Sequence, residues 1–421
     1  MKKSRVLLIY IMLSLVLFEG FFMDIGVPSY IKYVLDILNI VLFIISFKEI
    51  KDNKEQFKYF ALLYVIFFVL GSLSSIIHIG RWGFNIKYWV LDTRLYLRFP
   101  IFLISCSVIL KKDDIEKMFD CLMYYQLINT ILIIYQYFTV KADDYWMRGD
   151  YLNGFFGTSR GGNLYVNVLM VLVVTIVYIK WINKKINKWF GIVVIATCLL
   201  DATLIELKYF YVEFLIIVLL LFLFNYKNVK FTRENIIKGC AVILILLVGM
   251  FIMVQVLYKI YPWMKGTMSI KGIVRLATSQ TGYSDSGDFN RLTAVTGVFN
   301  KCFNKNILDG LLGIGIGNCN TGGNMTVFAQ LYDYTNYSWF QSSYVFAETG
   351  MVGLILYVLT FVCIYIKAGK DKYYSQIVRV MVVLSGLLII YDEVLKTEGA
   401  YLIFFILATG FINEKKRDEL V

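Results

Sequence analysis

Several residue types on which soluble enzymes and transporters depend are scarce in this 421-residue sequence. It contains a single histidine, His78, so no histidine cluster can bind a metal ion. It has only 3 prolines, so the proline-broken helices of many transporters are not indicated. Neither a low-complexity tract nor an internal repeat is recognisable. The sequence therefore indicates no metal and no other cofactor.

The 7 cysteines are an odd number and show no spacing typical of metal sites. Five of them lie in apolar runs, where cysteine behaves as a small hydrophobic residue: Cys106, Cys121, Cys198, Cys240 and Cys363. The other two, Cys302 and Cys319, share one polar segment. If that segment is extracellular, a disulfide between them is one option.

Apolar residues, in contrast, are abundant and arranged in long runs. Hydrophobic residues make up 59 % of the chain, against roughly 45–50 % in ordinary soluble domains, and the mean hydropathy is +0.67. Many runs approach the roughly 20 residues that cross a bilayer as a helix. The first follows MKKSR, but no small-residue cleavage site comes after it, so we expect a retained helix and not a signal peptide.

The breaks between the runs predict about 12 transmembrane helices in an all-α, polytopic membrane protein. The expected spans are 6–22, 29–47, 59–78, 95–110, 118–139, 163–181, 189–206, 208–226, 239–258, 342–366, 376–392 and 398–413. Alternate connections are rich in lysine, so the positive-inside rule places them and both termini in the cytoplasm. Helices one to nine then occupy residues 1–258, one large outer loop 259–341, and the last three helices and a cytoplasmic tail 342–421.

The outer loop is far longer than an ordinary connection. Amphipathic stretches such as FNRLTAVTGVFNKCF predict short helices against the outer membrane surface. The outer side is also basic, which the positive-inside rule does not explain; its cations include Arg81, Lys87, Arg94, Arg98, Arg148, Arg160, Arg275 and Arg291. They either anchor the protein at the interface or bind an anion such as phosphate, for which arginine offers planar, bidentate contacts.

Charged residues within or next to the apolar runs are costly, so they need partners or a function. Lys32 and Asp36 are four positions apart and are expected to pair with each other. Four charges gather at the turn between helices seven and eight: Asp201, Glu206, Lys208 and Glu213. Lys208 either pairs with a neighbouring glutamate or presents its charge to an anionic substrate. Glu348, at the start of helix ten, either interacts with the helix dipole or acts at an active centre.

The glycine-rich stretch DGLLGIGIGN at 309–318 resembles a phosphate loop at first sight. Its spacing does not match the dinucleotide-binding GxGxxG pattern, which also needs a parallel α/β domain. Its predicted place on the outer face argues against a nucleotide as well. Two interpretations remain: a tight turn against a helix, or backbone N–H groups close to an anion.

The segments FNRLTAVTGVFNKCFNKNILDGLLGIGIGN and SWFQSSYVFAETGMVGLILY resemble the O-antigen polymerase and O-antigen ligase superfamily, the Wzy-like proteins. The shared pattern is an arginine that opens an amphipathic helix, then Gly-x-Gly-x-Gly, then a helix with Glu-x-Gly-x-x-Gly. The matching positions are Arg291, Gly313, Gly315, Gly317, Glu348, Gly350 and Gly353. The stretch GFFGTSRGGN at 154–163 is also similar to a loop in this group, as is the large loop between helices nine and ten.

The resemblance implies a GT-C-like membrane glycosyltransferase that makes capsule, O-antigen or another surface polysaccharide. Such an enzyme transfers a growing glycan from undecaprenyl diphosphate to another lipid-linked repeat unit, on the outer face of the bacterial cytoplasmic membrane. It uses no nucleotide sugar, ATP or nucleic acid, and a flippase and a chain-length regulator are its expected partners.

The resemblance also suggests roles for residues of this chain. Arg291 and then Lys208 would stabilise the leaving diphosphate, and Glu348 or Asp288 would serve as the general base. The substrate-binding candidates are Arg160, Arg98, Tyr337, Trp339, Gly313, Gly315 and Gly317. The aromatic residues among them could instead anchor the protein in the membrane interface.

One departure from the family separates the competing functions. Ligases of the superfamily carry a His-Asn pair before the Glu-x-Gly motif, where this chain has Trp339 and Phe340. This favours a polymerase over a ligase. A flippase for lipid-linked oligosaccharide would need related halves and a polar central path, and neither is visible in the sequence.

Overall fold

The computed structural model describes residues 2–141, 145–225, 287–322, 325–369 and 372–412, together with single residues and short stretches between 248 and 279. The helix expected at 239–258 and the first third of the expected outer loop fall mostly outside these residues, as does the tail after 412. Within the described ranges the regular structure is entirely helical.

The longer helices of the described chain follow the expected spans closely. They are α1 (Lys2–Asp24), α2 (Ile31–Ile45), α4 (Lys54–Ile77), α6 (Ile86–Ile109), α7 (Lys112–Thr139), α8 (Asn163–Ile182), α9 (Lys188–Leu204), α10 (Lys208–Asn225), α17 (Gln341–Lys367), α18 (Lys372–Tyr391) and α19 (Ala400–Ala408). Seven of them are long and apolar enough to cross a membrane: α1, α4, α7, α8, α10, α17 and α18. This confirms a helical membrane protein, while the number of twelve spans stays a prediction.

Helix α6 begins earlier than expected, at Ile86 and not near residue 95. The connection predicted at 79–94 is largely helical as a result, with the short helix α5 (Ile79–Trp82) before it. The charged residues that seemed to exclude a helix here are tolerated because they have partners inside the protein. Arg94, for example, lies 2.9 Å from the Asp36 carboxylate of α2.

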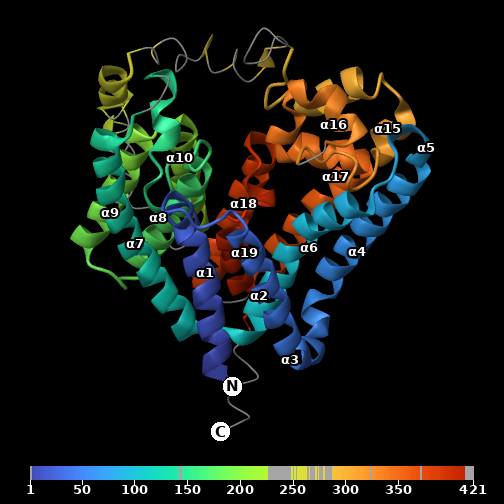
Figure 1. Ribbon diagram of the computed structural model, residues 1–421. Coiled ribbons are helices and arrows are strands. Elements are labelled where there is room, and N and C mark those ends of the chain that lie inside the picture. Colours follow the sequence, from blue (N-terminus) through green and yellow to red (C-terminus); the bar gives the residue numbers. More distant parts are fainter. Residues whose placement is uncertain are drawn as a thin grey trace.

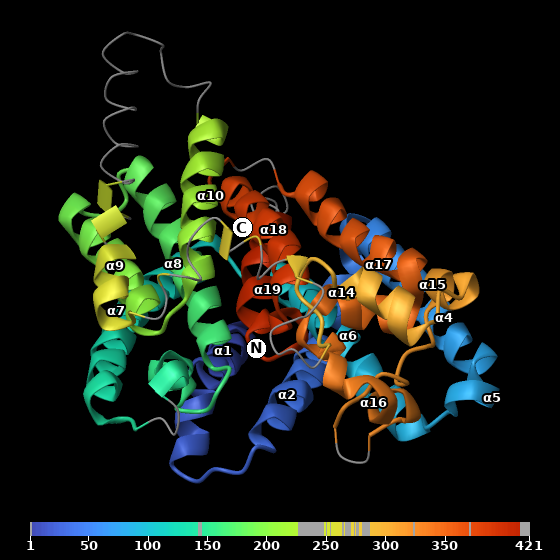
Figure 2. The same cartoon turned by 90° about the horizontal axis from the view of Figure 1, so that it is seen from above.

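The helices form two groups with a shared centre (Figures 1 and 2). On one side α7 packs against α8 and α9, and on the other α17 packs along α4. Between them stand α18 and α19, which contact α8, α6 and α17. Figure 1 shows α3 (Phe47–Asp52) at the end of the molecule near the N-terminus, and α5, α15 (Ile307–Leu312) and α16 (Val327–Tyr332) at the opposite end.

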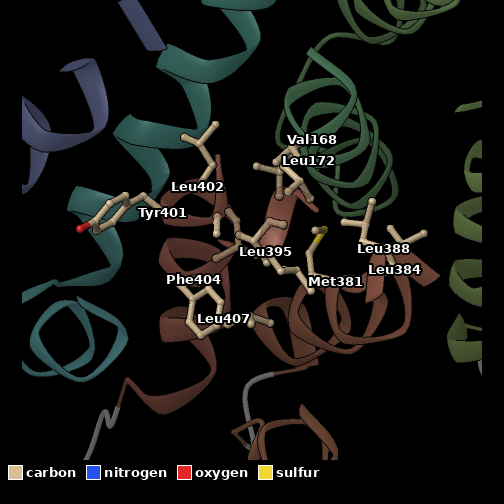
Figure 3. Packing of buried hydrophobic residues seen from close by; sticks show 14 of the residues in the cluster. Val168, Leu172, Met381, Leu384, Leu388, Leu395, Tyr401, Leu402, Phe404 and Leu407 are labelled. Atoms are coloured by element: carbon tan, nitrogen blue, oxygen red, sulfur yellow. The ribbon is translucent and has the colours of Figure 1, made fainter. Parts of the chain in front are cut away.

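The core lies where α8, α18 and α19 meet. Figure 3 shows Val168 and Leu172 of α8 close to Leu384 and Leu388 of α18. Every residue of α19 is buried, as expected for a helix that is apolar on all sides. Other helices leave apolar faces exposed, notably α2 and α4, and such faces suit contact with lipid.

The expected outer loop contains several short helices in its described part, as its amphipathic stretches predict. They are α14 (Ala294–Gly297), a π-helical turn (Val298–Cys302), α15, α16, and the 3-10 turns η5 (Asp333–Thr335) and η6 (Tyr337–Trp339). Cys302 and Cys319 are both free and buried in this segment, so the optional disulfide is not formed.

Candidate functional site

The glycine-rich stretch is buried between α4, α6 and α17. Gly315 and Gly317 have φ angles of +101° and +90°, which side chains disfavour. A Cβ atom on Gly315 would lie 2.2 Å from Cα of Ser75, and one on Gly317 would lie 2.6 Å from Cα of Trp89. The glycines are therefore required because backbone packs directly against helix backbone.

The N–H groups of these glycines are all used within the protein. Gly313 donates to the carbonyl of Asp309 at 2.8 Å. Gly315 donates to the carbonyl of Glu348 at 2.8 Å, and Gly317 donates to its Oε1 atom, also at 2.8 Å. On this geometry Gly313, Gly315 and Gly317 have no N–H group left for an anion, so their role in substrate binding finds no support here and stays a prediction. The tight turn is the interpretation that holds.

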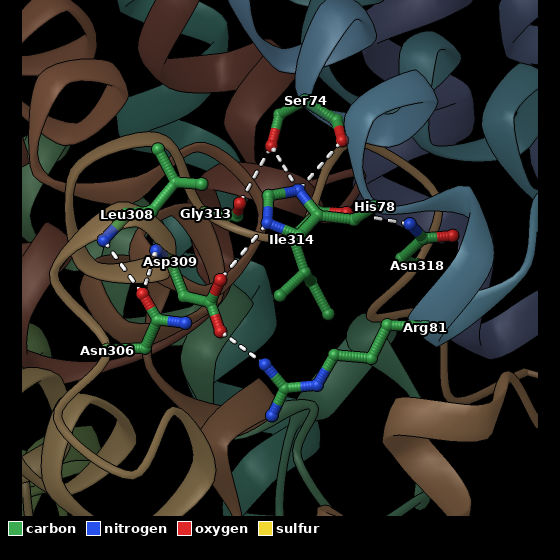
Figure 4. Close-up of polar contacts among 9 residues, drawn as sticks. All are labelled: Ser74, His78, Arg81, Asn306, Leu308, Asp309, Gly313, Ile314 and Asn318. Carbon is green, nitrogen blue, oxygen red and sulfur yellow. Dashed lines mark hydrogen bonds and ion pairs between the residues drawn. The ribbon is translucent and has the colours of Figure 1, made fainter.

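A polar network fixes the same stretch to α4 (Figure 4). Ser74 donates to the carbonyl of Gly313 at 2.7 Å. Nε2 of His78 lies 3.0 Å from Oδ1 of Asp309, and the Arg81 guanidinium donates to Oδ2 at 2.8 Å. The only histidine of the chain is thus a structural tie between α4 and α15. The serine, histidine and aspartate resemble a hydrolytic triad in composition only, since the buried Ser74 hydroxyl is committed to a carbonyl.

Glu348 belongs to this structural framework and not to an exposed active centre. Its side chain is fully buried, and its carboxylate accepts from Tyr96 Oη at 2.7 Å as well as from Gly317. Asp92 of α6 lies beside it as a second buried carboxyl group. The general-base role of Glu348 stays a prediction, and the complete burial of its side chain argues against it. Glu348 instead positions the glycine turn.

Two further candidates are buried away from any open site, and a third is exposed. Tyr337 is fully buried and donates to the carbonyl of Cys319 at 2.7 Å, so it offers no face to a sugar. Asp288 is buried and accepts from Asn336 at 3.2 Å, which does not suit a base. Trp339 is 48 % exposed and remains able to stack on a ligand or to lie in the interface.

Arg98 is held in a buried ionic network and not presented to a ligand. It donates to Oε1 of Glu398 at 2.9 Å and to the carbonyl of Lys396 at 2.6 Å, and it lies 3.6 Å from Asp36. Asp36 therefore pairs with Arg94 and Arg98, and the expected pairing with Lys32 is wrong. The partners of Asp36 come from α6, which sequence spacing within one helix could not reveal.

The charges at the turn between α9 and α10 separate into two kinds. Asp201 accepts from Gln126 at 2.7 Å and from Thr130 at 2.8 Å, and Glu213 accepts from Asn167 at 2.8 Å. Both acids are fully buried and serve to join helices. Glu206 and Lys208 instead are partly exposed, at the turn between the two helices.

Three basic residues from distant parts of the chain are linked by electrostatic interactions near this turn. We call Arg291, Lys208 and Arg160 the basic cluster. Lys208 interacts electrostatically with Arg291, and with the acids Glu206 and Asp150. Asp150 also lies 3.6 Å from Nε of Arg160, so it joins the two halves of the cluster. Like charges repel, so an arrangement that brings three cations together is typical of an anion-binding site.

Arg291 is held in a fixed orientation within the cluster. Its Nε atom donates to the carbonyl of Tyr391 at 3.1 Å, and its guanidinium lies 4.0 Å from the centre of the Tyr391 ring. That ring in turn stacks on Tyr209, with centroids 3.6 Å apart and planes 9° apart. Stacking and a backbone bond together set the plane of the guanidinium, which suits it to recognise the planar face of an anion.

Two acids beside the cluster have pKa values close to neutrality. Burial raises the pKa of Asp392 to about 7, with Glu393 acting in the same direction and Arg291 against it. Burial also raises the pKa of Glu206 to about 7, and Lys208 opposes the shift. Both acids become more negative as the pH rises through this range, which offsets the positive charge of the cluster.

The sequence did not single out Tyr209, Tyr391, Asp392 or Asp150. The only available signal was that Asp150 and Arg160 flank the stretch GFFGTSRGGN. The contact between Arg291 and Tyr391 spans 100 positions, and no local pattern marks it.

The packing of the glycine turn gives a first prediction. We expect Gly315→Ala to destabilise the protein, because its Cβ atom would meet the backbone of Ser75. Thermal unfolding of the purified protein in detergent should shift to lower temperature. Gly80→Ala is the matched control, since a Cβ atom there meets nothing within 4 Å. Equal unfolding temperatures for the two variants would contradict the packing argument.

The ionic network gives a second prediction. Arg98→Met would leave Asp36 and Glu398 buried without their cation, at a cost of about 3–5 kcal/mol in unfolding free energy. Lys58→Met removes an exposed pair with Glu55 and should cost no more than about 1 kcal/mol. Chemical denaturation of both variants measures the difference, and a smaller loss for Arg98→Met would contradict the structural role.

The near-neutral acids give a third prediction. Because ionised Asp392 and Glu206 oppose the cations, inorganic pyrophosphate should bind more weakly as the pH rises from about 6 to 8. The double variant Asp392→Asn with Glu206→Gln should flatten this dependence. Titration calorimetry at several pH values checks it, with the second ionisation of pyrophosphate itself measured in parallel. A variant with the wild-type pH dependence would refute the role of these acids.

Comparison with known proteins assigns no family to this chain. It matches no protein-family model, and no curated protein matches it.

Proposed function

We propose that this protein is a polysaccharide polymerase of the outer face of the bacterial cytoplasmic membrane. In this reaction a glycan moves from undecaprenyl diphosphate to a lipid-linked repeat unit. The observation that carries the proposal is the basic cluster, in which Arg291, Lys208 and Arg160 approach one another at one end of a helical membrane protein. A diphosphate at the membrane surface is the anion that such a site would bind.

The chemistry needs a fixed positive charge where the leaving group develops its negative charge. Stacking on Tyr391 and the Nε bond orient Arg291, so its guanidinium need not reorganise during the reaction. Lys208 adds a second charge from the opposite helix group. Neither a nucleotide nor a metal is required for this transfer, since the bond to the lipid diphosphate already supplies an activated sugar.

The proposal includes the predicted topology of twelve spans with both termini in the cytoplasm. Contacts among the lysine-rich connections support it. Arg5 near the N-terminus donates to Glu49 at 2.6 Å, and Lys367 lies 5.0 Å from the ring centre of Tyr59. Lys185 similarly bridges to Glu116 at 2.9 Å. Figure 1 shows the N-terminus and α3, which carries Glu49, at the end of the molecule opposite α5, α15 and α16.

A flippase for lipid-linked oligosaccharide and a ligase of the same superfamily are the alternatives. A flippase needs a polar path between its two sides, yet the centre of the described chain is filled by apolar side chains of α8, α18 and α19. A ligase is disfavoured because His78, the sole histidine, is committed to Asp309 and α4. The polymerase is the function that best fits both observations.

Substitution of the oriented arginine tests the proposal in cells. Arg291→Ala should lower polymer formation by about 10²–10³-fold, the effect of removing one donor to a developing charge. Arg291→Lys should recover part of the activity, because it keeps the charge but not the planar fork. Lys87→Ala, at an exposed outer lysine, is the control and should leave polymer length unchanged.

The accumulating product separates the alternatives in the same experiment. Single repeat units should still reach the cell surface in the Arg291→Ala strain, since only their joining is lost. Disappearance of these single units would indicate flipping instead. Polymer of normal length in that strain would refute the role of Arg291.

Reconstitution tests the reaction directly. The purified protein in lipid nanodiscs should lengthen a lipid-linked repeat unit without added nucleotide and release undecaprenyl diphosphate. Electrophoresis of the glycan and linkage analysis measure the product. The Lys208→Ala protein is the matched negative, and failure of the wild type to lengthen the glycan would overturn the polymerase proposal.

A further inference from the structure

A cavity of about 270 Å³ opens beside the basic cluster. Its walls come from the outer part of α1, the residues before α2, the start of α8, and the segment around η7 (Val394–Lys396). It includes Arg160 of the cluster among its lining residues. Sites for drug-sized ligands measure roughly 300–1,000 Å³, so this space suits a smaller group such as one sugar ring.

The lining combines the groups that recognise a sugar. The rings of Phe156 and Tyr165 stack with centroids 5.8 Å apart, and both border the cavity. Arg160 and Lys32 supply donors, and the carboxylates there supply acceptors for hydroxyl groups. Apolar ring faces beside charged hydrogen-bonding groups match the two sides of a pyranose.

Three carboxylates border the cavity, and two of them are already paired with cations of the protein. Glu393 lies 2.8 Å from Nζ of Lys396, and Glu398 accepts from Arg98 at 2.9 Å. Glu19 differs: among the residues that the structure describes, it has neither an ion pair nor a hydrogen bond for its carboxylate. It lies near the outer end of α1 and is only partly buried. Glu19 is therefore the acceptor that the cavity leaves available for a ligand.

The cavity and the basic cluster are continuous through Arg160 and Asp150. Arg160 lines the cavity and pairs with Asp150 at 3.6 Å, and Asp150 interacts with Lys208. A diphosphate bound by the cluster would thus have Glu19 across the same space. The two bases expected from the sequence, Glu348 and Asp288, are both buried elsewhere.

We propose that this cavity binds the terminal sugar of the acceptor glycan and that Glu19 is the general base for its attacking hydroxyl. This inference rests on the proposed polymerase function. The acceptor oxygen forms a bond to the anomeric carbon of the donor as the bond from that carbon to the diphosphate oxygen breaks. The bonding electrons leave with the lipid diphosphate, and the hydroxyl proton passes to the Glu19 carboxylate.

The test compares binding with turnover in the full-length protein in nanodiscs. The binding probe is the water-soluble repeat-unit oligosaccharide, released by mild acid from the lipid carrier of the source cells and followed by saturation-transfer NMR. Turnover is the lengthening of the intact lipid-linked unit. Glu19→Gln should still bind the probe but turn over about 10²–10⁴-fold more slowly, the contribution of a general base.

Two further variants complete the design. Ser29→Trp, at an exposed position on the cavity rim, should fill the space and abolish both binding and turnover. Asp24→Asn changes an exposed acid on the same helix and should alter neither. Wild-type turnover in Glu19→Gln would overturn the role of Glu19 as general base. If the wild type does not bind the saccharide, or if Ser29→Trp leaves binding unaffected, the cavity is not the sugar-binding site.

The design also separates this inference from the polymerase proposal. If the wild type and Glu19→Gln lengthen the glycan equally well, the polymerase function is supported and the general-base role of Glu19 is refuted. If the wild type binds the saccharide but never lengthens it, the polymerase and the proton transfer both fail, while the sugar site stands.

Discussion

The carboxylate of Glu348 is the contact on which the packing of the glycine turn against α6 and α17 depends. It accepts hydrogen bonds from the glycine turn and from Tyr96 of α6, and its own backbone carbonyl binds Gly315. Three segments far apart in the sequence thus meet at one side chain. Because the site is buried, each of these bonds lacks competition from water. Arg291 precedes α14, which packs against α17, the helix that carries Glu348.

The same low-polarity environment explains why the charges of the chain occur as sets. Arg98 forms ion pairs with Glu398 and Asp36, and Arg94 also pairs with Asp36. Lys180 of α8 forms ion pairs with Asp120 and Glu116 of α7. An isolated charge would be expensive at either place. The basic cluster follows the same rule, since Asp150, Glu206 and Asp392 face its three cations. Two of these acids, Glu206 and Asp392, have pKa values of about 7, so the net charge of the cluster changes with pH near neutrality.

Apolar length and loop charge were enough to predict the helices, because crossing a bilayer imposes a length on each run. The roles of individual charged residues could not be predicted where their partners lie far away in the sequence. Glu348 was ambiguous because its partners, Tyr96 and Asp92, lie about 250 positions earlier. Arg98 resembled an exposed anchor because Glu398 is 300 positions away. Arg291 and Lys208 were singled out through a resemblance, whereas the residues that orient them carried no signal in the sequence.

Helix α19 has a consequence for how the protein is assembled. All nine of its residues are buried against α1, α6, α8 and α18, so it has no face for lipid. It is also the last regular helix of the described chain, and it leaves the ribosome after its neighbours. The surfaces of these four helices that face α19 are therefore synthesised before the helix that covers them. Their final packing around α19 is thus a late step in assembly of the bundle.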